Sequence, residues 1–149
     1  MKPCFIFDLD GTLANANHRL YLITGENANA KKWDEFFDLC HLDTPIEHMI
    51  ALAWALNSAG WPIVIVSGRS DVVRGKTEEW LRQHFPFYEK LLMRPAEDHK
   101  DDDILKMEML AELRAMGYEP EMAFDDRSRV VSAWRAAGIP CAQVAAGDF

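Results

Sequence analysis

The N-terminal part of the sequence runs Phe5-Ile6-Phe7-Asp8-Leu9-Asp10-Gly11-Thr12-Leu13. The apolar residues predict a buried strand, and two carboxylates follow it directly. Asp8 and Asp10 are two residues apart, so their side chains project toward the same side, and Gly11 lets the backbone turn sharply. Close carboxylates repel each other unless a proton or a cation intervenes, and Mg²⁺ prefers oxygen ligands. A calcium loop is the alternative, but it would need a third acid, a later glutamate and flanking helices.

Short apolar runs alternate with longer amphipathic stretches along the rest of the chain. The predicted strands cover 4–7, 62–66, 91–93, 122–124 and 140–144, and the predicted helices cover 46–59, 71–85, 102–116 and 128–137. Most of the apolar runs lack polar alternation, which suits strands that are covered on both faces. This order predicts an α/β fold, a Rossmann-like doubly wound parallel sheet, in which ligands bind at the carboxyl ends of the strands.

Residues 14–44 interrupt this pattern after the first strand. The segment begins with polar residues, and Trp33, Phe36 and Phe37 fit one face of a helix. We expect a small, partly helical insert within a single domain that covers residues 1–149. Core packing is the expected role of Trp33, and stacking on a nucleobase is the alternative.

Composition excludes several classes of protein. The formal net charge of −8 argues against binding of nucleic acid or anionic membranes by excess positive charge alone, although a local basic groove stays possible. Cys4, Cys40 and Cys141 are widely spaced and form no CxxC motif, so they predict neither a disulfide framework nor a zinc site. No window approaches the roughly 18 apolar residues of a membrane span. We expect a cytoplasmic protein that does not bind membranes.

Three later segments carry polar residues beside predicted strands or on a helix. Ser67-Gly68-Arg69 follows the second strand, Lys106 lies in the third helix, and Asp125-Asp126 follows the strand at 122–124. Together with Asp8-Leu9-Asp10-Gly11-Thr12, they resemble the four motifs of the haloacid dehalogenase (HAD) superfamily, whose members mostly hydrolyse phosphate esters. The resemblance implies the HAD fold and Mg²⁺ as cofactor.

Each later motif also has a purely structural explanation. Ser67 could cap the following helix, Lys106 could be a solvated lysine, and Asp102 could belong to a set of acids that favour a helix N-terminus. Asp125 and Asp126 are harder to explain in this way, because ionised groups directly after an apolar strand need partners.

The stretch from Asp98 to Phe149, together with Met93-Arg94-Pro95, resembles the 3′-phosphatase domain of bacteriophage polynucleotide kinase-phosphatase and its stand-alone relatives. The resemblance implies a phosphomonoesterase with Asp8 as nucleophile and Asp10 as general acid and base. Mg²⁺ would be held by Asp8, the main-chain carbonyl of Asp10, and Asp126, with Asp125 as a further or outer ligand. The implied phosphate- and substrate-binding residues are Thr12, Arg19, Ser67, Arg69, Asp102 and Lys106, although Arg69 could instead pair with a nearby carboxylate.

The expected substrate is a 3′-phosphorylated DNA or RNA end, and a nucleotide is the alternative that the negative charge favours. A P-loop nucleotide kinase is a second alternative, because Gly75-Lys76-Thr77 ends like a P-loop, but Ser70 stands where that motif requires glycine. A regulatory member of the fold would be expected to lack Asp8 or Asp10. No protein partner and no oligomeric state can be inferred from the sequence.

Overall fold

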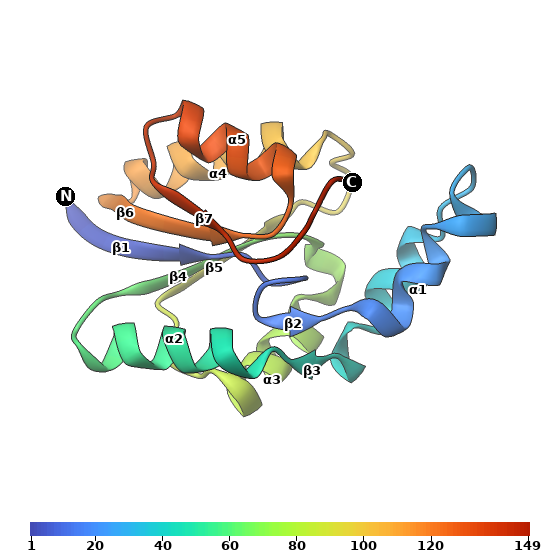
Figure 1. The fold of residues 1–149 in the computed structure, drawn as a ribbon, viewed down its shortest axis with the longest axis horizontal. Coiled ribbons are helices and arrows are strands. Elements are labelled where there is room, and N and C mark those ends of the chain that lie inside the picture. The colour runs from blue at the N-terminus through green and yellow to red at the C-terminus, as the bar shows by residue number, and fades with distance from the viewer.

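The computed structural model describes residues 1–149, and a five-stranded parallel sheet forms its centre (Figure 1). Its strands are β1 (Lys2–Phe7), β4 (Ile63–Ser70), β5 (Lys90–Arg94), β6 (Tyr118–Asp125) and β7 (Cys141–Gln143). They lie in the order β5-β4-β1-β6-β7, and every neighbouring pair is parallel. The chain therefore builds the sheet outward from β1 in both directions, which confirms the predicted doubly wound topology.

Helices cover both faces of the sheet (Figure 1). They are α2 (Glu47–Ser58), α3 (Arg74–His84), α4 (Asp102–Ala115) and α5 (Ser128–Ala136). Successive residues of a strand point to opposite faces. Phe7 belongs to the core cluster of Leu81 from α3, whereas Ile6 belongs to the cluster of Leu105 and Val131 from α4 and α5. Burial on both faces explains why the strand sequences lack polar alternation.

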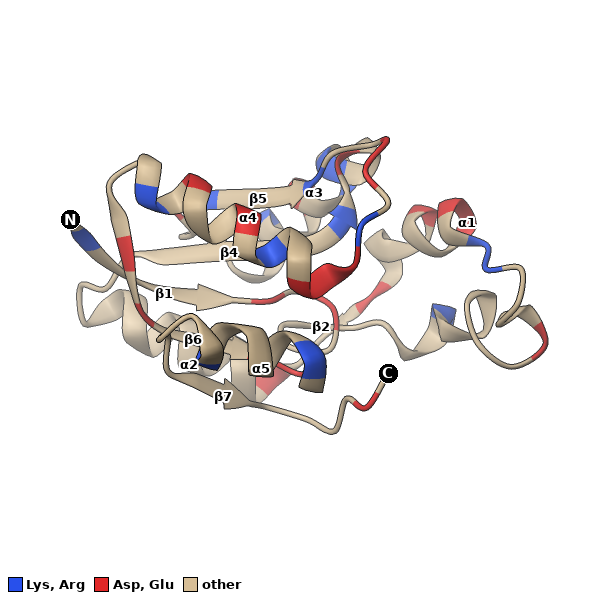
Figure 2. Cartoon of the chain, turned by 90° about the horizontal axis from the view of Figure 1, so that it is seen from above, with Lys and Arg blue, Asp and Glu red and all other residues tan.

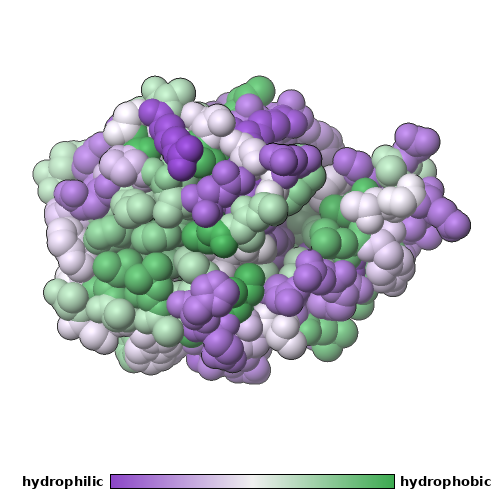
Figure 3. Space-filling model, in the orientation of Figure 1, coloured by the Kyte–Doolittle hydropathy of each residue, from purple (hydrophilic) through white to green (hydrophobic).

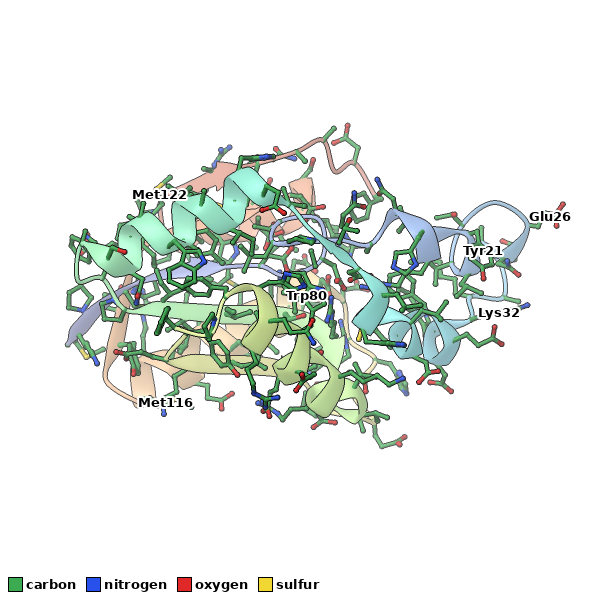
Figure 4. The ribbon with its side chains drawn as sticks, turned by 90° about the horizontal axis from the view of Figure 1, so that it is seen from below. Tyr21, Glu26, Lys32, Trp80, Met116 and Met122 are labelled. Atoms are coloured by element: carbon green, nitrogen blue, oxygen red, sulfur yellow. The ribbon has the colours of Figure 1, made fainter.

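The insert projects beyond the carboxyl ends of β1 and β4 (Figure 1). A short antiparallel ribbon of β2 (Ala14–Asn15) and β3 (Thr44–Pro45) closes its base. Between these strands lie α1 (Trp33–Asp38) and three 3₁₀ helices at Asn17–Leu22, Gly25–Asn27 and Cys40–Leu42. Figure 4 shows Tyr21, Glu26 and Lys32 on the projecting part. The partly helical insert is confirmed, whereas the ribbon was not predicted because strands of two residues carry no periodic signal.

Four strands are longer than predicted, and β6 and β4 are extended the most. β6 begins at Tyr118, four residues before the predicted start, because Pro120, which lacks an N–H, hides the strand signal. The β1–β6 register shifts between Cys4 and Phe5, next to the Cys4–Pro120 pair, so the ladder accommodates the proline there. β4 continues to Ser70, but its pairing with β5 is irregular between Val66 and Ser70. Ser67, Gly68 and Arg69 are thereby released from regular pairing with β5.

The three cysteines lie in the interior. Cys4, Cys40 and Cys141 are free and buried. Burial raises the pKa of both Cys4 and Cys141 to about 11, so both stay protonated thiols at neutral pH. None of the helices has the length and apolar character needed to cross a membrane.

Candidate active site

The turn after β1 places two carboxylates at the edge of the sheet. The N–H of Asp8 donates to the carbonyl of Phe124 at 3.0 Å, which continues the pairing of β1 with β6. The carbonyl of Leu9 then accepts the N–H groups of residues 12–14, so the chain folds back tightly. Gly11 has a φ of +83°, and a Cβ there would lie 2.1 Å from Oδ2 of Asp126. Glycine is therefore needed both for the turn and for the close approach of Asp126.

Asp8, Asp125 and Asp126 form a buried acidic cluster. β6 lies beside β1, and its last residue is Asp125, so the two strands deliver these side chains to the same place. One oxygen from each carboxylate lies within 4.8 Å of the others. Burial, with the charge of Asp125, raises the pKa of Asp8 well above its usual range, and burial raises the pKa of Asp126 to about 6.

This donor set fits a hard divalent cation. It consists of carboxylate oxygens only, and the carbonyl oxygen of Asp10 accepts no backbone hydrogen bond. The three carboxylates outnumber Lys106, the single lysine that contacts them, so the cluster keeps an excess of negative charge. Oxygen ligands and excess negative charge are what Mg²⁺ requires.

Lys106 and Thr12 hold the carboxylate of Asp8. Lys106 is only 2% exposed, and its Nζ lies 2.8 Å from Oδ1 of Asp8 and 2.7 Å from Oδ2 of Asp125. Both acids keep the pKa of Lys106 above its usual value although burial opposes this. Thr12 Oγ1 donates to the other Asp8 oxygen at 3.3 Å. Lys106 is therefore not a solvated helix lysine, and it orients Asp8.

Two buried arginines bind the carboxylate of Asp10. Oδ1 of Asp10 accepts hydrogen bonds from Arg69 Nη2 at 2.6 Å, Arg69 Nε at 3.0 Å and Arg19 Nη2 at 2.7 Å. Burial opposes ionisation of Asp10, but the two guanidinium groups hold its pKa below the usual range. The alternative in which Arg69 pairs with a carboxylate is thus the arrangement observed. Oδ2 of Asp10 has no protein partner, and its side chain is 27% exposed, so this oxygen can exchange a proton.

Asp43 also binds both arginines, although no sequence motif predicted it as a site residue. Its carboxylate accepts from Arg19 Nε at 2.8 Å, Arg19 Nη2 at 2.7 Å and Arg69 Nη2 at 2.9 Å. Asp43 lies at the end of the insert and matches no recognised motif. The contact with Arg69 joins residues that are 26 positions apart, so no local pattern could reveal it.

The residues of the second motif lie where the pairing of β4 with β5 is irregular. Ser67 is buried, and its Oγ accepts from the N–H of Arg69 at 3.1 Å. It does not cap the next helical segment, because Ser70 Oγ accepts from Val72 N at 3.3 Å and serves as that cap.

Asp102 begins α4 and joins three parts of the site. Its two oxygens accept from Arg94 Nη2 at 2.6 Å and from Arg127 Nη1 at 3.0 Å. A Cβ on Gly68 would lie 2.5 Å from Asp102 Oδ1, so Asp102 packs directly against the second motif. Asp102 therefore does more than favour the N-terminus of a helix.

The charged side chains gather at one edge of the molecule. Figure 2 shows acidic residues at the end of β1 and the start of α4, close to basic residues of neighbouring elements. The space-filling view shows the surface hollowed where the body meets the insert (Figure 3). All of the predicted site residues named above lie at this carboxyl edge of the sheet.

The structure does not support a P-loop. Gly75, Lys76 and Thr77 lie in the first turn of α3, and only the 3₁₀ turn Asp71–Val73 separates this helix from β4. Lys76 Nζ bonds the carboxylate and the carbonyl of Asp38 on the insert, and Thr77 accepts a hydrogen bond from Arg69. No wide loop is left to surround a phosphate.

The aromatic residues of α1 divide between core and surface. Phe36 is buried as expected, and its ring lies 4.3 Å from the guanidinium carbon of Arg19. Trp33 is 43% exposed and stacks on Phe37 with ring centroids 5.7 Å apart. The expectation that Trp33 packs in the core is therefore wrong in part.

Comparison with known proteins identifies the family. Residues 2–149 match the family model of the polynucleotide kinase PNKP phosphatase domain. A candidate bifunctional polynucleotide kinase/RNA ligase of Autographa californica nuclear polyhedrosis virus is 31% identical over 134 residues, which are 89% of this chain and 18% of that protein.

Solved structures agree with the family match. A chain of the Pnkp1/Rnl/Hen1 complex superposes with a TM-score of 0.83 at 31% identity, over 100% of this chain and 48% of that one. The class C acid phosphatase of Bacillus anthracis shares the fold, with a TM-score of 0.65 at 15% identity over 97% of this chain and 68% of that one. The chain thus spans less than half the length of the first two relatives. It belongs to the family of polynucleotide kinase PNKP phosphatase domains, a group with the HAD fold.

Proposed function

We propose that this phosphatase domain is a Mg²⁺-dependent phosphomonoesterase that removes the 3′-phosphate from polynucleotide ends through an aspartyl-phosphate on Asp8. One observation carries the proposal: Asp8 is held by Lys106 and Thr12 within the acidic cluster at the carboxyl end of β1. A carboxylate nucleophile divides a difficult hydrolysis into two easier steps.

The residues that would hold Mg²⁺ are Asp8, Asp126 and the carbonyl of Asp10. Asp125 suits a further or outer position, because Lys106 occupies its Oδ2 and the N–H of Arg127 donates to its Oδ1 at 3.2 Å. Bound there, Mg²⁺ would offset the repulsion between the anionic nucleophile and the anionic phosphate.

In the first step, a carboxylate oxygen of Asp8 forms a bond to phosphorus while the bond from phosphorus to the ester oxygen breaks. Oδ2 of Asp10 gives its proton to the departing oxygen. Arg19 and Arg69 oppose protonation of Asp10 in the free protein, but an incoming phosphate dianion nearby favours it. Lys106 and Ser67 would bind the phosphoryl oxygens. The N–H of Thr12 donates to the carbonyl of Leu9, so Thr12 would contribute through its contact with Asp8 instead.

In the second step, Asp10 takes a proton from water as the water oxygen bonds to phosphorus. The bond between phosphorus and Asp8 breaks, which releases inorganic phosphate and restores the carboxylate. The two arginines favour this ionised form of Asp10, so they suit the base role directly.

The polynucleotide substrate is supported by the family and by the names of the relatives. One is a candidate kinase/RNA ligase, and another structure is described as the Pnkp1/Rnl/Hen1 RNA repair complex. An RNA or DNA end in nucleic-acid repair is therefore the proposed substrate. A small nucleotide is the second candidate, because the net charge of −8 disfavours a long polyanion.

Phosphate release from matched substrates tests the proposal. A 3′-phosphorylated oligonucleotide, the same oligonucleotide with a 5′-phosphate and a 3′-mononucleotide are compared in Mg²⁺ and in excess chelator. We expect the 3′-phosphorylated oligonucleotide to react fastest, only with Mg²⁺, and Asp8→Asn to be inactive. Equal rates at both ends, with the mononucleotide fastest, would indicate a nucleotidase. Full activity in chelator would rule out the metal-dependent mechanism.

A further inference from the structure

We propose that Asp43 is a positioning residue for the acid–base step. It holds Arg19 and Arg69 in place against Asp10, so that Oδ2 of Asp10 faces the leaving group. This inference rests on the proposed function and names a residue that supports its chemistry.

The four side chains form a closed ring of ion pairs. Arg19 Nη2 lies 2.7 Å from both Asp10 Oδ1 and Asp43 Oδ2, and Arg69 Nη2 lies 2.6 Å and 2.9 Å from the same two atoms. Two guanidinium groups face two carboxylates, so the formal charges of the ring balance. Charge-assisted hydrogen bonds of this kind are strong and directional.

The two carboxylates of the ring have different surroundings. Asp10 is 27% exposed and uses only Oδ1 in the ring, whereas the side chain of Asp43 is 0% exposed and uses both oxygens. His18 Nε2 lies 2.7 Å from Asp43 Oδ1 at the outer side of the ring. Asp43 is thus enclosed and does not reach the substrate, while Asp10 lies at the open side. Asp43 can therefore influence the reaction only through the arginines.

The backbone of Asp43 is anchored independently of its carboxylate. Trp80 Nε1 on α3 donates to the carbonyl of Asp43 at 2.7 Å, and the N–H of Asp43 donates to Cys40 at 3.2 Å. Figure 4 shows Trp80 beneath the sheet, close to where the insert joins the body. An asparagine at position 43 would keep these backbone contacts, and it would remove the charge and one of the two acceptor oxygens.

The arginines also keep some contacts without Asp43. Arg19 Nη1 donates to the carbonyl of Phe36, and Arg69 Nη1 donates to Thr77. Without the charge of Asp43, however, two buried cations would share the single carboxylate of Asp10. They would lose the contacts with Asp43 that fix their orientation, so they would no longer hold Oδ2 of Asp10 toward the leaving group. The step that needs a proton from Asp10 should suffer most.

The choice of leaving group tests this inference. A sugar hydroxyl needs a proton as it departs, whereas p-nitrophenolate does not. For Asp43→Asn, we expect kcat on a 3′-phosphorylated oligonucleotide to fall by about 10- to 100-fold, less than the full effect of general acid catalysis. The first-turnover burst with p-nitrophenyl phosphate should change by less than about 3-fold.

Asp38→Asn is the matched control, because Asp38 lies on the same insert but is exposed and pairs with Lys76. We expect it to behave as wild type on both substrates. Trp80→Phe keeps the carboxylate and removes the indole hydrogen bond to Asp43 together with part of the ring's core packing, so it should give a smaller loss with the same preference. It also provides the test if thermal unfolding shows that Asp43→Asn does not fold.

Equal losses on both substrates, or no loss, in folded Asp43→Asn would overturn the positioning role. Wild-type protein that hydrolyses neither substrate would refute the proposed function, and this inference with it. The wild-type rates and the substrate preference of the variant thus distinguish the two failures.

Discussion

In the absence of divalent metal, the free energy of unfolding of the protein should decrease as the pH rises from 5 to 8. The reason lies in Asp126, whose pKa is raised from 3.8 to about 6 by burial. Across this range the carboxyl of the unfolded chain is ionised throughout, whereas the folded protein binds a proton at pH 5 and loses it by pH 8. The folded state therefore binds more protons, and its stability falls as the pH rises.

The size of the effect follows from the pKa of Asp126. Where the folded state binds one proton more than the unfolded state, each pH unit changes the free energy of unfolding by about 1.4 kcal/mol. For Asp126 this condition holds from pH 5 to the pKa of about 6, which is roughly one unit. Asp8, whose pKa is also raised, contributes with the same sign. A loss of about 1.4 kcal/mol lowers Tm by roughly 3–6 °C in a domain of this size.

Thermal unfolding between pH 5 and 8, with chelator and with saturating Mg²⁺, measures the effect. Mg²⁺ should raise Tm most at pH 8, because a bound cation stabilises the ionised carboxylates. Asp126→Asn is the control that isolates this carboxyl: in chelator at pH 8 it should be more stable than wild type, and it should gain less from Mg²⁺. A wild-type Tm in chelator that stays constant or rises toward pH 8, with the same profile in Asp126→Asn, would refute the reasoning.

Other substitutions test individual residues. Asp10→Asn should slow release of a sugar alcohol by about 10²–10⁴-fold, but with p-nitrophenyl phosphate it should give a burst and then a low steady rate; equal losses without a burst would contradict the acid–base role. Gly11→Ala should weaken Mg²⁺ binding, measured by calorimetry, because the new Cβ would lie 2.1 Å from Asp126 Oδ2 and the φ of +83° disfavours alanine; unchanged affinity would contradict this. Lys76→Ala should leave phosphatase activity close to wild type. An ATP-dependent phosphorylation that wild type catalyses and Lys76→Ala does not would revive the kinase alternative.

The sequence predicted the sheet because the apolar runs and helical stretches carry clear local signals. Asp8 and Asp125 could also be placed together, since carboxyl ends of parallel strands meet at one edge of the sheet. Asp43 could not be found, because its partners come from distant segments and the insert that carries it consists mainly of short 3₁₀ helices. Periodicity also could not show that Trp33 is partly exposed, because its spacing matches that of the buried Phe36.

The arrangement around Asp10 depends on tertiary contacts in the same way. The family resemblance implied a function for Arg19 and Arg69, but not that both bind one oxygen of Asp10. A guanidinium can pair with any acid that the fold brings near it. Only the structure shows that Oδ1 is occupied and Oδ2 is left for a proton.

Chemical trapping of the phosphoenzyme tests the central claim most directly. Wild type and Asp10→Asn are mixed with an oligonucleotide that carries a radiolabelled 3′-phosphate, quenched during the first turnover, treated with borohydride and mapped by mass spectrometry. An acyl phosphate is reduced by borohydride to the alcohol, so we predict homoserine at position 8 in wild type. We expect less of it in Asp10→Asn, which lacks the proton donor for the departing sugar oxygen, and none with the 5′-phosphorylated oligonucleotide. Release of labelled phosphate with unmodified aspartate at position 8 throughout would contradict the account.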